Sequence, residues 1–239
     1  MKTIFVKPSG GRRAAVHKLA GAAVLVAGRP LAQGDAFARR APACVLTPQQ
    51  TEGPYFVNER LERADIRSDP SDGTLRSGLP LALSMRIATL SRGRCEPATG
   101  AIVDVWHCDA AGVYSDVDDA NLRTKGSAFL RGYQVTDAHG QVRFATIYPG
   151  AYRGRAGHIH FKVRTNSGAR AAEFTSQLYF DDGLTDRVHE RPPYGGPGSR
   201  RTRNGDDALF RAGGPSLILD ARRDGDGYAA AYDVGLRGA

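Results

Sequence analysis

The sequence of 239 residues contains no run of about 18 consecutive apolar residues, which is the minimum for a helix that crosses a membrane. We therefore expect no stable membrane insertion. Cysteine is also scarce, because Cys44, Cys95 and Cys108 are the only three, and no two of them form a Cys-x-x-Cys pair. This spacing gives no support for a zinc ribbon or a thioredoxin-type centre, and it allows one disulfide and one free thiol.

Beyond residue 44, basic and acidic side chains are present in nearly equal numbers. The formal net charge is +8, but residues 1–44 hold eight Lys or Arg and only one acidic residue. The rest of the chain therefore carries 25 basic and 24 acidic side chains, close to neutrality. Binding to nucleic acid needs a concentrated basic face, so we expect no nucleic-acid partner.

The basic N-terminal segment has the order of parts found in export signals. Arg12 and Arg13 precede the uncharged stretch 19–28, and residues 36–38 (Ala-Phe-Ala) form a small-x-small cleavage site. Residues 1–38 thus resemble a twin-arginine signal, which predicts a periplasmic or secreted protein with its folded domain at 39–239. The alternative is a disordered basic tail on a cytoplasmic protein.

Glycine and proline are plentiful, with 29 and 13 residues, and the apolar residues of the domain alternate with small or polar ones. This alternation is clearest at Leu81, Leu83, Met85 and Ile87, and it is typical of a strand with one buried face. Strands are expected at 81–87, 101–106, 129–136, 142–147, 157–164, 175–180, 217–219 and 228–234. Turns are expected at 137–140, as a hairpin, and at 224–227, and a long loop at 194–207. The pattern predicts an all-β fold, a β-sandwich of mostly antiparallel strands joined by long loops.

A pair of histidines lies in one of these expected strands. Because side chains alternate along a strand, His158 and His160 share one face, while Ile159, Phe161 and Val163 share the other. The two imidazoles are about 6.6 Å apart along the backbone, close enough to bind one metal ion. A polar strand face exposed to solvent is the alternative interpretation.

Two tyrosines near the pair strengthen the metal hypothesis. Tyr152 lies in the loop 148–155, just before the histidines, and Tyr114 follows the expected strand 101–106. Phenolates are hard anionic ligands suited to iron(III), and two of them with two neutral imidazoles leave the ion one net positive charge. This donor set predicts a centre that resists reduction and accepts a dianionic ligand.

Together with these residues, several motifs resemble the intradiol ring-cleavage dioxygenase family, which includes protocatechuate 3,4-dioxygenase and catechol 1,2-dioxygenase. The resemblance covers most of residues 44–185, with separate motifs in the family's order. These motifs are TPQQTEGPYF at 47–56, DIRSD at 65–69, GAIVDVWHCDAAGVYS at 100–115, RGYQVTD at 131–137, FATIYPGAYRGRAGHIHF at 144–161 and TSQLYFDD at 175–182.

The resemblance implies a non-haem Fe(3+) enzyme whose long loops carry the active site. It would open a catechol-type ring between the two hydroxyl-bearing carbons with O2 and give a muconate-type diacid. The implied ligands are Tyr114, which stays bound, Tyr152, which leaves when the substrate binds, and His158 and His160. Arg155 would stabilise negative charge that develops on the ring.

The resemblance also implies residues around the substrate. Gln177 matches a family residue that lines the pocket near the iron. Independently of the resemblance, Tyr133 alternates with inward positions of its expected strand and is a candidate for the same pocket. Ala151 stands where exported relatives often carry tryptophan, which could widen the pocket beside Tyr152. The substrate itself stays open among protocatechuate, catechol, hydroxyquinol and larger catechols, and a homo-oligomer is the default expectation.

Two rival functions are kept at this point. One is a non-catalytic β-sandwich that binds ligands with the family's shape, and the other is a zinc or copper site built on the histidine pair. The remaining histidines are expected to have structural or solvated roles, with His107 hydrogen-bonded inside the fold and His139 and His189 on solvated loops. Trp106 is expected in the core.

Overall fold

The computed structural model describes residues 45–119, 122–167, 170–195 and 201–238, all of which belong to one unit, Gln33–Ala239. The export signal expected at 1–38 and Cys44 lie outside the described residues. Cys95 is disulfide-bonded, and Cys108 is a buried free thiol. Within the described residues, no helix is long and apolar enough to cross a membrane.

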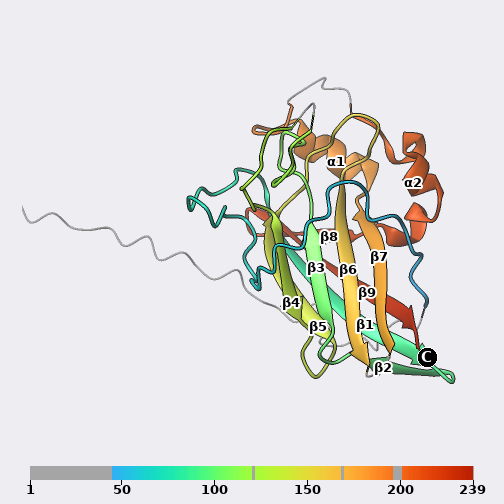
Figure 1. Ribbon diagram of the computed structural model, residues 1–239. Coiled ribbons are helices and arrows are strands. Elements are labelled where there is room, and N and C mark those ends of the chain that lie inside the picture. Colours follow the sequence, from blue (N-terminus) through green and yellow to red (C-terminus); the bar gives the residue numbers. More distant parts are fainter. Residues whose placement is uncertain (1–44, 120–121, 168–169, 196–200, 239) are drawn as a thin grey trace, which may run out of the picture. The chain divides into compact units, whose positions relative to one another are not determined.

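The first sheet is mixed and is built around one long strand (Figure 1). Its strands are β1 (Pro80–Ser91), β2 (Arg94–Pro97), β5 (Gln141–Ile147), β8 (Asp220–Asp224) and β9 (Gly227–Arg237). One edge of β1 pairs with β9 in parallel, and its other edge is shared by β5 and β2, both antiparallel. The strand β8 then pairs antiparallel with β9.

The second sheet is antiparallel throughout and carries the candidate site. It has the order β4 (Arg131–Val135), β3 (Ile102–Trp106), β6 (His158–Ser167) and β7 (Arg170–Tyr179). In this register Trp106 of β3 and Gln177 of β7 are the two cross-strand neighbours of His160. The protein is therefore mostly β, with two sheets in a sandwich-like arrangement, and the expected fold class is confirmed.

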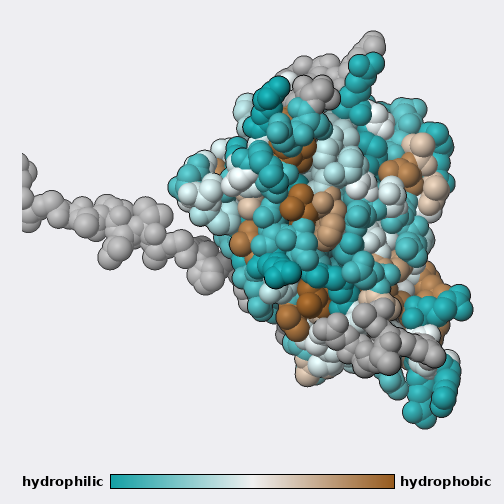
Figure 2. Space-filling view, viewed as in Figure 1, coloured by the Kyte–Doolittle hydropathy of each residue, from teal (hydrophilic) through white to brown (hydrophobic). Residues whose placement is uncertain are grey.

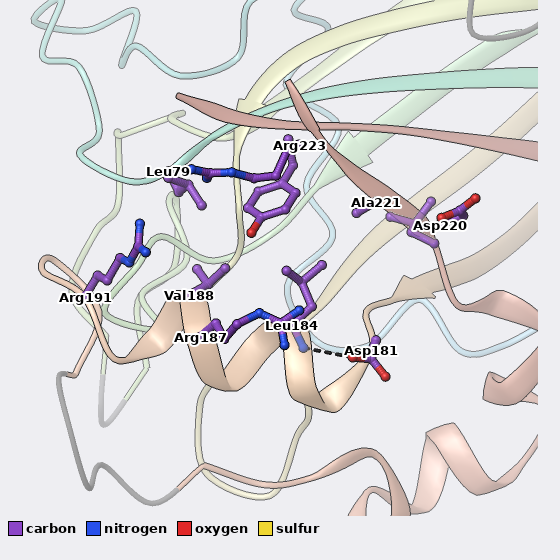
Figure 3. Close-up of a pocket in the computed structure, with 11 residues that line it drawn as sticks. Leu79, Asp181, Leu184, Arg187, Val188, Arg191, Asp220, Ala221 and Arg223 are labelled. Atoms are coloured by element: carbon purple, nitrogen blue, oxygen red, sulfur yellow. Dashed lines mark hydrogen bonds between the residues drawn. The ribbon is translucent and has the colours of Figure 1, made fainter. Parts of the chain in front are cut away.

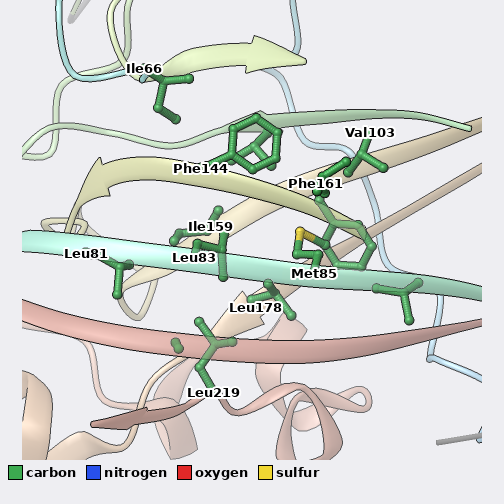
Figure 4. Close-up of a cluster of buried hydrophobic side chains, with 14 of the residues drawn as sticks. Ile66, Leu81, Leu83, Met85, Val103, Phe144, Ile159, Phe161, Leu178 and Leu219 are labelled. Atoms are coloured by element: carbon green, nitrogen blue, oxygen red, sulfur yellow. The ribbon is translucent and has the colours of Figure 1, made fainter. Parts of the chain in front are cut away.

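The inner faces of the two sheets supply the hydrophobic core (Figure 4). Leu83 and Phe144 come from the first sheet, and Val103, Ile159 and Phe161 come from the second; each is at most 2% exposed. Burying side chains of this size contributes roughly 1.5–3 kcal/mol each. The face of the molecule in Figure 2 is mainly hydrophilic, and its apolar residues form small separate areas.

Two short helices lie outside the sheets, α1 (Asp182–His189) and α2 (Ala208–Arg211), together with 3-10 turns at Asn204–Asp206 and Gly214–Leu217. Both helices begin at an aspartate that caps the first turn: Asp181 accepts a hydrogen bond from Leu184 N, and Asp207 accepts one from Leu209 N. Aspartate is a favoured N-cap because its carboxylate satisfies backbone N–H groups that have no partner inside the helix.

Two details of the predicted strands are wrong. The turn at 137–140 exists, but it joins β4 to β5, which lie in different sheets, so it is no hairpin. The last hairpin is also shifted, because the apolar residues 217–219 are not a strand and the charged segment Asp220–Asp224 is. The turn that follows at Gly225 and Asp226 has a glycine at φ +55° and connects β8 and β9, as expected.

Gly140 in the turn between the sheets allows a sharp test of packing. Its φ is +72°, and an added Cβ would lie 2.2 Å from Ile87 O. We expect Gly140→Ala to destabilise the protein by roughly 2–4 kcal/mol, since the backbone must shift in addition to the strain of a left-handed alanine. Gly73→Ala is the matched control, because Gly73 has φ +74° with no atom within 4 Å and adds only the strain. Urea unfolding would measure both, and equal losses would contradict the packing argument.

Candidate metal centre

The histidine pair lies on the outer face of the second sheet, as strand alternation predicts. His158 and His160 are 1% and 2% exposed, and their Nε2 atoms are 3.0 Å apart. The Nδ1 atom of His158 donates to Ala156 O at 2.6 Å, which leaves its Nε2 with a lone pair. The ring of Trp106 stacks on His160 at 4.9 Å, with the planes 8° apart.

The two predicted tyrosines reach the same place from separate loops. Tyr114 is fully buried, and its Oη lies 3.3 Å from His158 Nε2. The ring of Tyr152 lies 5.7 Å from the Tyr114 ring and 5.8 Å from the His158 ring, centroid to centroid. All four predicted ligands therefore converge on one spot.

The protonation states of these groups suit a cation. Burial, followed by the positive charge of Arg155, lowers the pKa of His158 to about 3. Burial and the neighbouring His158 lower the pKa of His160 well below its usual value. Both imidazoles are therefore neutral at pH 7. Burial is also the main cause that raises the pKa of the Tyr114 and Tyr152 hydroxyls, so each keeps its proton until a cation replaces it.

The spacing of the donor atoms also fits a metal ion. Two donors that each lie about 2.1 Å from one ion, at an angle near a right angle, are about 3.0 Å apart. The observed separations of 3.0 Å between the two Nε2 atoms and 3.3 Å to Tyr114 Oη are close to this value. Among the described residues, no group of three or more His, Cys, Asp or Glu side chains could hold a metal ion. Metal binding at this spot therefore depends on the phenols.

Arg155 sits beside the four residues in a tight network. Its Nε donates to Asp207 Oδ2 at 2.9 Å, its Nη1 lies 3.4 Å from Tyr152 Oη, and its Nη2 donates to Gln177 Oε1. Gln177 is completely buried, and Tyr179 also donates to its Oε1, at 3.3 Å. Although burial acts to lower it, the pKa of Arg155 is raised by its neighbours Tyr152, Asp207 and Tyr179, of which Asp207 is the carboxylate, so the guanidinium stays charged.

Asp207 is a functional candidate that the sequence pattern missed. It is completely buried, and Oδ2 accepts both from Arg155 and from Ala156 N at 3.0 Å. Its other oxygen, Oδ1, caps α2 through Leu209 N at 2.9 Å. The carboxylate thus ties the loop that precedes His158 to a helix about 50 residues later in the chain. An Asp directly before an Ala-Leu-Phe segment is an N-cap signal that could have pointed to it.

The segment 47–57 covers the site and is hydrogen-bonded to β7. Ser176 Oγ donates to Pro48 O at 2.7 Å, and Gln177 Nε2 donates to Thr51 O at 3.0 Å. Gly53 turns with φ +71°, and a Cβ there would contact His160 Cε1 at 3.4 Å. This covering segment explains why the outer face of the sheet is buried at the histidines.

Tyr55 and Arg131 support Tyr114 from the other side. The rings of Tyr55 and Tyr114 are 4.5 Å apart. The buried Arg131 guanidinium donates to Tyr55 O at 2.6 Å and to Ser115 O at 2.5 Å, which joins the covering segment to the Tyr114 loop. The sequence pattern did not indicate this role for Arg131.

A cavity of about 660 Å³ adjoins Tyr152. Ala151, Tyr152 and Arg153 line one side of it, and His189 and Arg201 line another. The small side chain of Ala151 leaves this space open beside the phenol. Ala151 therefore borders a cavity next to Tyr152, and its substrate-binding role stays a prediction.

Tyr133 is not part of the cluster. It lies on β4, and its hydroxyl donates to Glu62 Oε2 at 3.4 Å. Its ring lines a separate small cavity with Trp106 and Glu59. Among the described residues, no hydrogen bond or ring contact joins Tyr133 to the four candidate ligands, so its substrate role stays a prediction.

The other histidines and Trp106 differ partly from expectation. His107 is fully buried and hydrogen-bonded, as predicted, while His139 is exposed in its turn. The prediction for His189 is wrong, because it is 7% exposed, bonds to Pro149 O and stacks on Tyr194. Trp106 is buried as expected, but in a cluster against the site and outside the main core.

His107 gives a prediction on pH. Its ring bonds to Cys108 O at 2.8 Å and to Thr146 Oγ1 at 2.7 Å, and burial lowers its pKa from 6.5 to about 4. The unfolded chain therefore takes up a proton below pH 6.5 that the folded chain takes up only near pH 4. Stability is lost as the pH falls through this window, by about 2 kcal/mol at pH 5 from this group.

We expect His107→Asn to lose this part of the pH dependence. The variant is less stable than the natural chain at pH 7.5, and the difference shrinks by about 2 kcal/mol at pH 5. Urea unfolding of the metal-free protein at both pH values measures it. A difference that is the same at the two pH values would show that His107 is not kept neutral by the fold.

The similarity of this chain to known proteins identifies the class of protein to which it belongs. A family model described as "Dioxygenase" matches residues 51–188, which is more than half of the chain. A chlorocatechol 1,2-dioxygenase of Pseudomonas sp. (strain P51) is 33% identical over 150 residues, which cover 55% of each chain. The protocatechuate 3,4-dioxygenase beta chain of Burkholderia cepacia is 31% identical over 183 residues, which cover 71% of each chain.

Solved structures agree with these relatives. An intradiol ring-cleavage dioxygenase from Tetranychus urticae superposes with a TM-score of 0.67 at 31% identity, and the match covers 81% of this chain and 94% of that one. The chain belongs to the intradiol ring-cleavage dioxygenase family, as its motifs predict. It spans about half the length of the catechol and chlorocatechol 1,2-dioxygenases that it matches.

Proposed function

We propose that this chain is a non-haem iron(III) dioxygenase that opens a catechol-type ring between the two hydroxyl-bearing carbons. The observation that carries the proposal is the convergence of Tyr114, Tyr152, His158 and His160 in one buried place. Two neutral imidazoles and two tyrosines that bind a cation as phenolates form a hard, anionic donor set, and iron(III) is the common biological ion that such a set suits.

Iron(III) held by Tyr114, Tyr152, His158 and His160 would supply a Lewis acid that activates a catecholate for reaction with O2. The chain's own residues prepare the site for the substrate. Tyr114 is completely buried and held by the Tyr55 ring, so it is the ligand that stays in place. Tyr152 is only partly buried and borders the 660 Å³ cavity, so it is the ligand with room to move.

Tyr152 also has a role as a base. In its phenolate form, its Oη would take a proton from one of the substrate hydroxyls. The Nη1 atom of Arg155 lies 3.4 Å from that oxygen and steadies its negative charge until the proton arrives. The cavity beside Ala151 provides space for the neutral phenol after the transfer.

Arg155 then stabilises negative charge on the ring. Its guanidinium is fixed on one side by Asp207 and on the other by Gln177, and it carries a full positive charge in a partly buried site. Charges that are held in place before the reaction stabilise a transition state without the cost of reorganisation. Both atoms of O2 end in the diacid product as the bond between the two hydroxyl-bearing carbons breaks.

The substrate class rests on the family. Relatives are named for catechol, chlorocatechol and protocatechuate. We propose a catechol-type substrate for this chain, with space beside Ala151 for a ring substituent.

The test uses the purified chain loaded with ferric iron. We expect a burgundy colour from charge transfer between the phenolates and iron(III), uptake of one O2 per catechol, and a diacid product. A screen of catechol, protocatechuate, hydroxyquinol and chlorinated catechols, with oxygen uptake and product absorbance recorded, would identify the substrate. Catechol binding without oxygen uptake would instead favour a binding protein, and a colourless protein that holds zinc would contradict the iron proposal.

We also propose that residues 1–38 direct export to the periplasm or the medium. The disulfide at Cys95 supports this, because disulfides persist in oxidising compartments. Replacing Arg12 and Arg13 by lysine should retain the protein in the cytoplasm on cell fractionation. Unchanged export of the variant would contradict a twin-arginine route.

A further inference from the structure

A second cavity, separate from the metal centre, lies between α1 and the β8–β9 hairpin. Its volume is about 530 Å³, which is within the range of small-molecule sites. Its floor is apolar and includes Leu79, Leu184, Val188 and Leu219, all of them buried or partly buried. Figure 3 shows these walls converging from α1, from the hairpin and from the segment before β1. We call it the helix–hairpin groove.

One face of α1 lines the groove, and a different face of the helix is turned toward the rest of the domain. Leu184, Arg187 and Val188 have the spacing of a single face of α1, and Arg191 follows the C-terminal end of the helix; all four line the groove. On the other side, Thr185 bonds to Tyr148 Oη at 2.8 Å. The groove is therefore a separate site.

Charge divides the groove into two ends. Arg191 and Arg223 lie away from Asp181 and Asp220, which occupy the opposite end (Figure 3). Asp220 is paired with Arg222 at 2.6 Å, and Asp181 caps α1. Among the residues that the structure describes, Arg191 and Arg223 form no ion pair, and the Arg223 guanidinium lies over the Tyr228 ring, 5.3 Å from its centroid. Two guanidinium groups at one end of an apolar groove are suited to a carboxylate.

We propose that the helix–hairpin groove binds an organic acid with one carboxylate and an apolar body. The carboxylate lies between Arg191 and Arg223, and the body covers the floor at Val188 and Leu219.

The test measures the binding of 4-phenylbutyrate to the full chain by calorimetry. We expect one saturable site, and binding at least about tenfold weaker for the uncharged 4-phenylbutan-1-ol. An alcohol that binds as tightly as 4-phenylbutyrate would overturn the proposal, and so would the absence of saturable binding.

Substitution of the two groove arginines tests whether the acid binds in the helix–hairpin groove. Arg191→Gln and Arg223→Gln should each weaken 4-phenylbutyrate at least about fivefold, because each removes one charged donor. Arg222→Gln is the matched control, since Arg222 is the next residue on β8, points to the other face and is bonded to Asp220. It should change the affinity by less than about twofold. All three side chains are exposed, so folding should be kept, which thermal unfolding would check. Equal effects of Arg222→Gln and Arg223→Gln, or none from Arg191→Gln and Arg223→Gln, would overturn the assignment.

Discussion

Replacing Tyr114 by phenylalanine is expected to lower kcat/KM for ring opening by at least about a hundredfold and to weaken the visible charge-transfer band. The change removes one oxygen and keeps the ring. That oxygen lies 3.3 Å from His158 Nε2 and is completely buried, so water cannot easily take its place. Without it the site has one phenolate in place of two, which lowers its preference for iron(III). Iron content, the visible spectrum and oxygen uptake measure the effect.

Tyr55→Phe is the matched control for this experiment. The Tyr55 ring lies 4.5 Å from the Tyr114 ring, so both variants lose a hydroxyl in the same neighbourhood. Tyr55 is not a proposed ligand, and its variant should keep the iron, the colour and most of the activity. If Tyr114→Phe retained the band of the natural chain at full strength, Tyr114 would not be a ligand, and the proposed centre would be wrong.

Local periodicity was enough to predict part of the site. Alternation along a strand places His158 and His160 on one face and Ile159 and Phe161 on the other, and the structure has this arrangement. The pattern works because one face of β6 is packed in the core, and a shift by one residue would bury the histidines there. The approach of Tyr114 and Tyr152 is a tertiary property, and the family motifs were needed to predict it.

The partners that hold the site could not be predicted from local patterns. Arg155 is fixed by Asp207, which lies in a segment expected to be a plain loop. Arg131 reaches Tyr55 O across 76 residues. Such contacts depend on how distant loops fold over the sheet, and a single sequence carries no periodic signal for them.

The topology errors have a similar cause. The strand β8 reads Asp-Ala-Arg-Arg-Asp, and its charged side chains give no apolar alternation. Charge is common on edge strands because it discourages pairing with other chains. The apolar residues 217–219 instead place Leu217 and Leu219 in the interior, with Leu219 N donating to Tyr179 O at 2.8 Å. The hydrophobic pattern therefore predicted which of these residues are buried, but it did not predict which segment forms the hydrogen-bonded strand.

Asp207→Asn is expected to lower kcat by about ten- to a hundredfold while iron stays bound. The aspartate serves Arg155 and Ala156 N with one oxygen and caps α2 with the other. An asparagine has a single oxygen, so it can serve either Arg155 and Ala156 N or the α2 cap, and its NH2 group faces the donors on the other side. Arg155 then loses an anionic neighbour that positions it, and the guanidinium is free to turn away from the ring. Asp207 is thus a positioning residue, which acts on the reaction through Arg155.

A purely structural role for Asp207 would give a different result. Loss of the α2 cap alone costs about 1 kcal/mol of stability and leaves kcat unchanged in the folded fraction. Asp186→Asn is the matched control, because Asp186 also pairs with arginine, Arg201 at 2.8 Å, but among the described residues it forms no hydrogen bond or ion pair with Arg155 or with the four candidate ligands. We expect the visible band to persist in both variants and kcat to fall only in Asp207→Asn, with KM changed less than kcat. Equal kcat values in the two variants would show that Arg155 is held in place without Asp207.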